Sequence, residues 1–223
     1  MRDTLIELFD REFVESQEAL GMRIIGQFRD LDNSDRFVWL RGFPDMARRA
    51  EALQAFYGGP VWKAHREAAN ATMIDSDNVL LLRPARANSG FQLDTSIRPA
   101  AGMSNSSEGL VIATIYYFNA PVSATFVDFF ERELKPALTE VGAPILAYFV
   151  TENSANTFPA LPVREGEQVF VWFSRFANMT AYEGFDAAFT ERTELARELT
   201  SRLRGLPEVL KLSPTARSQL RGR

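Results

Sequence analysis

The chain has 223 residues, 46% of them apolar, and its 25 basic and 29 acidic side chains leave a net charge of −4. This balance gives no reason to expect nucleic acid as a partner, and no stretch approaches the roughly 18 apolar residues of a membrane span. The chain has no cysteine and one histidine, which excludes disulfides and metal sites built on several Cys or His of one chain. We expect a cytoplasmic protein whose basic spots, Arg48–Arg49 and Arg217 among them, are solvated surface.

The first predicted element is an amphipathic helix over residues 4–20, where apolar side chains recur at helical spacing. Gly21 is well placed as its C-terminal cap. Asp45 is a good N-cap and begins a second helix. Short apolar runs between and after these helices predict three strands, over 24–29, 36–43 and 79–83.

The same order of elements returns in the second half, because the chain contains an internal repeat. The helix from Thr4 matches the one from Thr125, which lies 121 positions later. FVWLRGF from Phe37 matches FVWFSRF from Phe170, 133 positions later. DNVLLLRP, ending at Pro84, matches PEVLKLSP, 130 positions later. The second half therefore has a longer loop before its FVW strand and loses about three residues where the first half has Gly58-Gly59-Pro60.

The second half also has a strand before its first helix, GLVIATIYYFNAP over 109–121, which completes the ferredoxin-like order β-α-β-β-α-β. The first half has no counterpart, although this strand lies in the middle of a ferredoxin-like sheet. Either the chain start is placed too late, or another segment, best FQLDTSI at 91–97, fills the position. The predicted units are 1–84 and 109–214, with a linker over 85–108 and a basic tail over 215–223.

The predicted strands are apolar on both faces, and such strands need cover on both sides. The two helices of each half can cover only one face, so the sheet of the other half is expected to cover the second. We therefore predict an α+β fold in which two tandem ferredoxin-like repeats pack sheet to sheet. The result is a pseudo-twofold α/β barrel with helices outside, whose first repeat lacks its first strand.

Three stretches of the chain together resemble the NIPSNAP family of the dimeric α/β-barrel superfamily. They are GLVIATIYYFNAP, the run from FVTEN to REGE, and the run from GFPDM to LLLRP. The resemblance implies the barrel fold and a pocket between sheet and helices or inside the barrel. Relatives in the superfamily include cofactor-independent monooxygenases, haem-binding degraders and stress-response proteins, so the fold alone implies no single activity. Family members usually begin with a strand before the first helix, and this chain lacks it.

Arg41 is the first candidate for ligand binding, because it lies in an apolar strand on the face of Phe37, Trp39 and Phe43. A buried arginine needs a carboxylate or a ligand anion. Its repeat counterpart is Ser174, so the fold does not require the charge. The alternative is an arginine at a strand end whose guanidinium reaches solvent.

The loop over 151–167 replaces a short turn of the first half, and long loops on a rigid scaffold often bind ligands. Its alternative role is to cover the barrel mouth. Tyrosines of the second half could position an aromatic substrate or donate protons, or they could belong to the core. The candidate ligand-binding residues are Trp39, Arg41, Trp62, Tyr116, Tyr148, Glu152, Asn156, Phe158 and Trp172.

His65 is the candidate catalytic residue, as a general base or an axial haem ligand. It shares the apolar face of its predicted helix with Val61 and Ala68, and Trp62 is close enough to flank the ring. Its repeat counterpart is Leu195, so the fold does not demand an imidazole. The alternative is a histidine at the helix–sheet boundary, bonded to a carbonyl or a carboxylate. Haem-degrading relatives in the superfamily place a histidine on the corresponding helix.

Two classes of function follow from these patterns and the resemblance. The first is a protein that binds a hydrophobic small molecule, aromatic or polyketide-like, and that carries out oxidation of the monooxygenase type without a cofactor or with haem. The second is a non-catalytic module for ligand binding or protein interaction. The sequence requires no cofactor, and it leaves open both haem and a homodimer.

Overall fold

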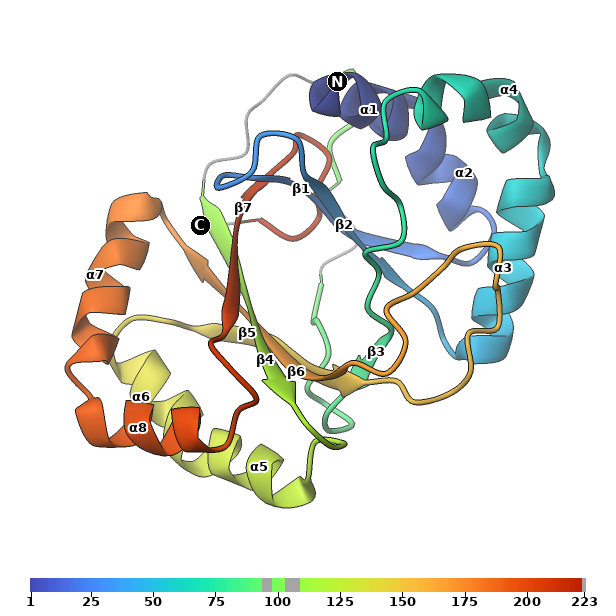
Figure 1. Cartoon of the computed structure of the whole chain (residues 1–223). Helices are drawn as coiled ribbons and strands as arrows, with labels where there is room; N and C mark the ends of the chain where they lie inside the picture. Colours follow the sequence, from blue (N-terminus) through green and yellow to red (C-terminus); the bar gives the residue numbers. More distant parts are fainter. Residues whose placement is uncertain (94–97, 103–108, 222–223) are drawn as a thin grey trace.

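A computed structural model describes residues 1–93, 98–102 and 109–221. Its centre is a strongly curled antiparallel sheet with helices on the outside (Figure 1). The strands of the described residues are β1 (Arg23–Asp30), β2 (Phe37–Gly42), β3 (Leu82–Pro84), β4 (Leu110–Phe118), β5 (Ile145–Thr151), β6 (Gln168–Phe176) and β7 (Glu208–Pro214). They form one seven-stranded sheet in the order β2-β1-β7-β4-β6-β5-β3.

The second half has a complete ferredoxin-like sheet, in the order β7-β4-β6-β5. β4 lies at its centre and pairs with β6 from Leu110, opposite Phe176, to Phe118, opposite Gln168. On its other side β4 pairs with β7. The apolar run that predicted this strand is explained by its place, because β4 is covered on both faces.

Two seams join the halves into a single sheet. Phe28 lies opposite Pro214 where β1 meets β7, and Leu82 lies opposite Thr151 where β3 meets β5. In each seam the last strand of one half pairs with the strand that follows the first helix of the other half. The predicted α+β fold is confirmed as a curled antiparallel sheet, a half-barrel with helices outside, and hydrogen bonds across the seams make the sheets of the two halves continuous.

The edges of the sheet are β2 and β3, the strands that would flank a first strand of the first half. No described residue forms a strand between them. Residues 91–93 of the alternative segment are not in a strand, and residues 94–97 lie outside the described part. β3 therefore has three residues and a single partner, β5.

The first helix of each half contains a π-helical segment at the same repeat position. In the first half α1 (Arg2–Leu8), η1 (Phe9–Phe13) and α2 (Val14–Glu18) follow one another. In the second half the same course is taken by α5 (Ala124–Phe129), η3 (Phe130–Leu134) and α6 (Lys135–Glu140). Gly21 and Gly142 follow these helices with positive φ, as predicted for C-terminal caps. Apolar spacing did not predict the π-helical segments, which shift it by one residue.

Two of the remaining helices, α3 (Met46–Gly58) and α7 (Met179–Thr190), begin at the predicted caps. Asp45 accepts a hydrogen bond from the Arg48 amide at 2.7 Å, and Asn178 accepts one from the Ala181 amide at 2.9 Å. The other two are α4 (Pro60–Asn70) and α8 (Thr193–Ser201). None of the helices in the described residues is long and apolar enough to cross a membrane.

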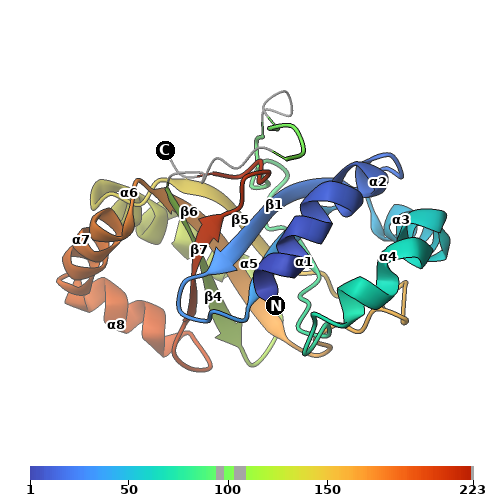
Figure 2. The ribbon, with the colours of Figure 1, turned by 90° about the horizontal axis from the view of Figure 1, so that it is seen from above.

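The core has three parts: one helix-side core in each half and the barrel interior between them. Helices α1 to α4 lie on one side of the strands and α6 to α8 on the other (Figure 2). Side chains fill the interior, including Phe28, Phe173 and Leu212 from the strands. The segments that follow β3 and β7 each add an apolar side chain to it, Phe91 and Leu220. Ligand binding is therefore better sought on the helix side of the sheet.

Two arginines correct the expectation of a solvated basic surface. Arg49 and Arg217 are each only 3% exposed. Arg217 lies under the first helix, where it donates to the Asp10 carbonyl and forms an ion pair with Glu15. Arg48, beside Arg49, is exposed and pairs with Glu51 at 2.7 Å, as expected of a surface residue.

Candidate binding site

An aromatic cluster occupies the helix-side core of the first half. Phe9 and Phe13 form its buried floor. Phe9 contacts the Phe37 and Trp39 rings at 5.5 and 5.7 Å, and Phe13 contacts the Trp62 ring at 5.6 Å. Over this floor lie five half-buried aromatic side chains, which we call the first-half aromatic face: Phe37, Trp39, Tyr57, Trp62 and Phe158.

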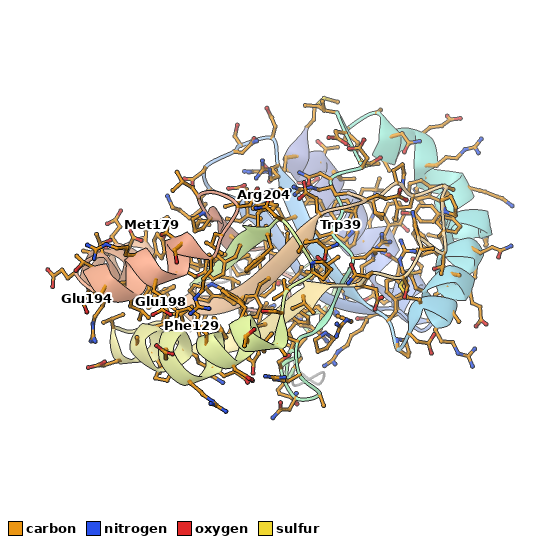
Figure 3. All side chains as sticks on the ribbon, turned by 60° about the horizontal axis from the view of Figure 1, so that its bottom comes forward. Trp39, Phe129, Met179, Glu194, Glu198 and Arg204 are labelled. Carbon is orange, nitrogen blue, oxygen red and sulfur yellow. The ribbon has the colours of Figure 1, made fainter. Side chains whose placement is uncertain are left out.

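The long loop over 151–167 reaches from the second half onto this face. Phe158 stacks on Tyr57, with ring centroids 5.6 Å apart and an interplanar angle of 15°. Tyr57 in turn meets Trp62 edge to face at 4.9 Å. Loop and helices thus form one aromatic surface. Figure 3 shows Trp39 on the side of the first half, apart from Phe129 among the helices of the second.

Arg41 lies on the helix side of β2, as its position in the strand predicted. Its Nη1 donates to the Gln17 Oε1 at 3.0 Å, and the Gln17 amide nitrogen donates to the Phe13 carbonyl at 2.7 Å. Gln17 is 1% exposed. Arg41 therefore has a neutral partner held in a fixed position, and no described carboxylate forms an ion pair with it.

Arg49, in the first turn of α3, lies close to Arg41 and anchors the loop. Its Nη1 donates to the Asn156 Oδ1 at 3.0 Å and to the Thr157 Oγ1 at 3.3 Å. Burial, and secondarily the charge of Arg41, lower the pKa of Arg49 from its ordinary value. The described partners of Arg49 include no carboxylate, and arginine stays protonated in proteins, so no described acidic partner balances its positive charge beside the first-half aromatic face.

Asn156 holds the loop in shape while it contacts Arg49. Its amide nitrogen donates to the Leu161 carbonyl at 3.0 Å, and its Oδ1 also accepts from the Phe158 amide at 3.0 Å. Thr157 donates to the Met46 carbonyl at 2.9 Å, which ties the loop to the start of α3. These bonds fix Phe158 over Tyr57.

His65 is half-buried between α4 and the first helix. Its Nε2 lies 3.5 Å from the Glu12 Oε2, and its ring meets Phe13 edge to face at 6.3 Å. Neither of the two surface hollows described below includes His65. Its roles as a general base or an axial haem ligand stay predictions. No group of three or more His, Asp or Glu in the described residues is placed to hold a metal ion.

The other predicted residues lie elsewhere. Tyr116 and Trp172 belong to the closed helix-side core of the second half, where burial raises the pKa of Tyr116. Tyr148 belongs to the same core and is 6% exposed, and its hydroxyl donates to Glu131 at 2.5 Å. Burial first, and then this bond, raise the pKa of Tyr148 to about 12. The Glu152 carboxylate accepts from the Ser154 amide at 2.8 Å, within its own loop.

Each half has one surface hollow beside its first helix, and neither hollow is lined by residues of the first-half aromatic face. One of about 380 Å³ is lined by Glu15, Glu18, Arg98 and Arg217 among others, whose charges are paired with one another. The second, of about 610 Å³, has Tyr148 in its wall and is open to solvent. Of the predicted site residues, Tyr148 is the one that borders either of these two hollows of the described part.

The structure thus brings together Trp39, Arg41, Trp62, Asn156 and Phe158, and it adds three residues that sequence reasoning missed. Gln17, Arg49 and Tyr57 carry no motif. Their repeat counterparts could have revealed two of them, because Gln17 matches Leu138 and Arg49 matches Tyr182. The signal for both was the same: each is polar or charged at a position where the other half has an apolar or aromatic residue.

Comparisons with known proteins found similarity in the fold of the backbone and no match in sequence. No protein-family model matches the chain, and neither does any curated protein sequence. One similar solved structure is a proposed monooxygenase from Lactobacillus acidophilus, 12% identical, covering 95% of this chain and 86% of that one with a TM-score of 0.47. Another is an anthrone oxidase-like protein, 14% identical, covering 100% and 92% with a TM-score of 0.49. At these values neither bears on function, and the likeness to NIPSNAP stays a resemblance.

Proposed function

We propose that this protein binds a hydrophobic aromatic small molecule on the first-half aromatic face. One observation carries the proposal. The same three residues, Phe-Val-Trp, occur in β2 and β6, yet Phe170 and Trp172 are 0% and 3% exposed while Phe37 and Trp39 stay half-buried. The architecture can bury this sequence completely, and in the first half it does not.

Half-buried aromatic side chains are suited to small planar ligands. Their rings offer large apolar surfaces and edge-to-face contacts, and a ligand that covers them removes that surface from water. Contiguous apolar patches that stay accessible on a folded chain commonly mark a binding site. The loop carrying Phe158 gives the face a second wall.

The three tryptophans provide a test within one protein. We expect 2-naphthamide, a neutral planar aromatic, to shift the indole N–H signals of Trp39 and Trp62 in ¹H–¹⁵N spectra. The signal of Trp172, buried in the second half, should stay in place. Unchanged signals of Trp39 and Trp62 at millimolar probe would refute the proposal, and so would a shift confined to Trp172.

A protein-interaction module is the alternative, since the same half-buried rings could contact a partner chain. The Arg41–Gln17 and Arg49–Asn156 contacts favour a small ligand, because they place polar donors beside the rings in fixed positions. Oxidation of the monooxygenase type stays a prediction, and its candidate catalytic residue is His65, whose contacts are with Glu12 and Phe13 of the first helix.

A further inference from the structure

We propose that Arg41 and Arg49 form an anion subsite next to the first-half aromatic face, so that the ligand is a planar aromatic carboxylate. This inference rests on the proposed function and makes it more specific, because it assigns a charged group to the ligand. It is carried by three observations: the burial of Arg49, the neutral partners of both arginines, and the residues found at the same positions of the second half.

The first observation is that Arg49 is only 3% exposed and forms no ion pair with an acidic side chain of the described residues. Arginine stays protonated in proteins, and buried charges are normally paired. The two hydrogen bonds that the described residues offer to Arg49 both go through Nη1, to Asn156 and Thr157. Among those residues Nε and Nη2 have no partner, which leaves one edge of the fork for a carboxylate.

The second observation is that Arg41 repeats the pattern. Its described hydrogen bond goes to the side-chain oxygen of Gln17, which is neutral. Arg41 is close enough to Arg49 for its charge to contribute to the lowered pKa of that group. Two like charges brought together without an acidic residue repel each other, and a bound anion would relieve that repulsion.

The third observation comes from the repeat. The positions of Gln17, Arg41 and Arg49 hold Leu138, Ser174 and Tyr182 in the second half, all of them buried. The fold at these positions is therefore compatible with a core that has no charge. The first half carries two positive charges that its architecture does not need, and they lie beside the aromatic side chains that remain accessible.

Anchoring of the loop is the competing explanation for Arg49. It predicts no dependence of affinity on the charge of the ligand. Neutral acceptors on Asn156 and Thr157 could be served by a neutral donor as well as by a guanidinium. Loop anchoring also gives no role to Arg41, whose partner Gln17 belongs to the first helix. An anion subsite explains both arginines, and it alone predicts that affinity depends on the charge of the ligand.

The test compares two probes of nearly the same shape by isothermal titration calorimetry, 2-naphthoate and 2-naphthamide. We expect the native chain to bind 2-naphthoate about tenfold or more tightly than the amide, as charge-assisted bidentate hydrogen bonds would give. Arg49→Gln should lower the affinity for 2-naphthoate to that for the amide, which removes this preference. Arg48→Gln, a change at the neighbouring exposed arginine, should leave the preference intact.

Further variants keep every outcome decisive. Arg41→Ser copies the second half and should reduce the preference, which provides a second arm if Arg49→Gln does not fold. Asn156→Ala breaks the loop contact and keeps both charges, so the preference should survive. Equal affinity of the native chain for both probes would overturn the anion subsite and leave the proposed function standing. Binding of neither probe would overturn both, and loss of the preference in Asn156→Ala would assign Arg49 to loop anchoring.

Discussion

The two halves begin with the same pattern and end with different helix-side cores. β6 lies between β4 and β5, and its Phe170 and Trp172 are buried. β2 has β1 on one side and is an edge of the sheet on the other, and every residue in it is only half-buried. The difference teaches that closure of this core depends on the neighbouring strands as much as on the residues of the strand itself.

The two helix-side cores also differ in the polarity of their side chains. The closed core of the second half is built from aromatic and aliphatic side chains, among them Phe130, Leu138 and Tyr182. The open core of the first half admits Gln17, Arg41 and Arg49 beside its rings. A charged group can be accommodated more easily where a core is accessible, because desolvation is the main cost of burying it. The repeat therefore separates residues that the fold needs from residues it only tolerates.

The largest expected effect tests the closure of the two cores directly. Phe130 and Phe9 are repeat counterparts, 0% and 5% exposed. Phe130→Ala should cost about 4 kcal/mol of unfolding free energy, because it empties a closed core. Phe9→Ala should cost less, about 2 to 3 kcal/mol, because its neighbours Phe37 and Trp39 are half-buried and can adjust. Denaturant titration of both variants measures the difference, and equal costs would contradict it.

A smaller effect is expected at a bulge that both halves share. The register of β1 shifts between Ile24 and Gly26, and that of β5 shifts at the equivalent Ile145 and Ala147. A Cβ on Gly26 would lie 2.6 Å from Cε2 of the fully buried Phe28. Gly26→Ala should therefore cost roughly 1–3 kcal/mol through overpacking.

The reverse change at the equivalent position is the control for Gly26. Ala147→Gly should cost about 1 kcal/mol, from the greater backbone freedom of glycine. Both variants are measured by thermal unfolding under the same conditions. A Gly26→Ala variant as stable as the native chain would mean that the Phe28 ring can move aside, and that the two bulges are equivalent in packing.

The repeat explains how much of the fold was predictable from the sequence. Matching FVWLRGF to FVWFSRF and reading the caps at Asp45 and Asn178 placed the strands and helices, because these signals are local. The sharing of strands across the seams was not predictable in detail. The pairing of β3 with β5, and of β7 with β1, depends on contacts between residues far apart in the chain, such as Leu82 with Thr151.

The candidate site was predictable only in part. Arg41 could be predicted because a charge in an apolar strand is visible in the sequence, and Phe158 could be predicted because its loop is long. The prediction that Arg49 lies on the solvated surface was wrong, although an arginine in a basic pair at a helix start is typical of a surface residue. The loop that covers it comes from residues 151–167, over a hundred positions away, and no local pattern indicates that contact.

Asp10 provides a pH test of the first helix. Burial, opposed by the charge of Arg217, raises the pKa of Asp10 from 3.8 to about 6. Because the folded-state pKa is raised, the favourable contribution of the protonated carboxyl is complete below about pH 4 and is lost as the pH rises through 6. Asp10→Asn should therefore raise the melting temperature at pH 7 and change it little at pH 4. Parallel profiles of melting temperature against pH would contradict this.

The smallest effect is expected at His65. Its pair with Glu12 spans 3.5 Å between side chains 32% and 28% exposed, and ion pairs so open to solvent contribute about 0–1 kcal/mol. His65→Leu copies Leu195, which packs against the core of the second half. We expect the free energy of unfolding to change by about 0.5 kcal/mol or less and the affinity for 2-naphthoate to stay the same.

Denaturant titration and calorimetry on the same His65→Leu preparation separate the two roles of this residue. Unchanged stability with unchanged binding assigns the imidazole to the contact between α4 and the first helix. Unchanged stability with lost binding would instead place it among the ligand contacts, next to Trp62 on the same helix. That result would extend the binding site along α4, and it would show that an aliphatic residue satisfies the fold at this position but not the ligand.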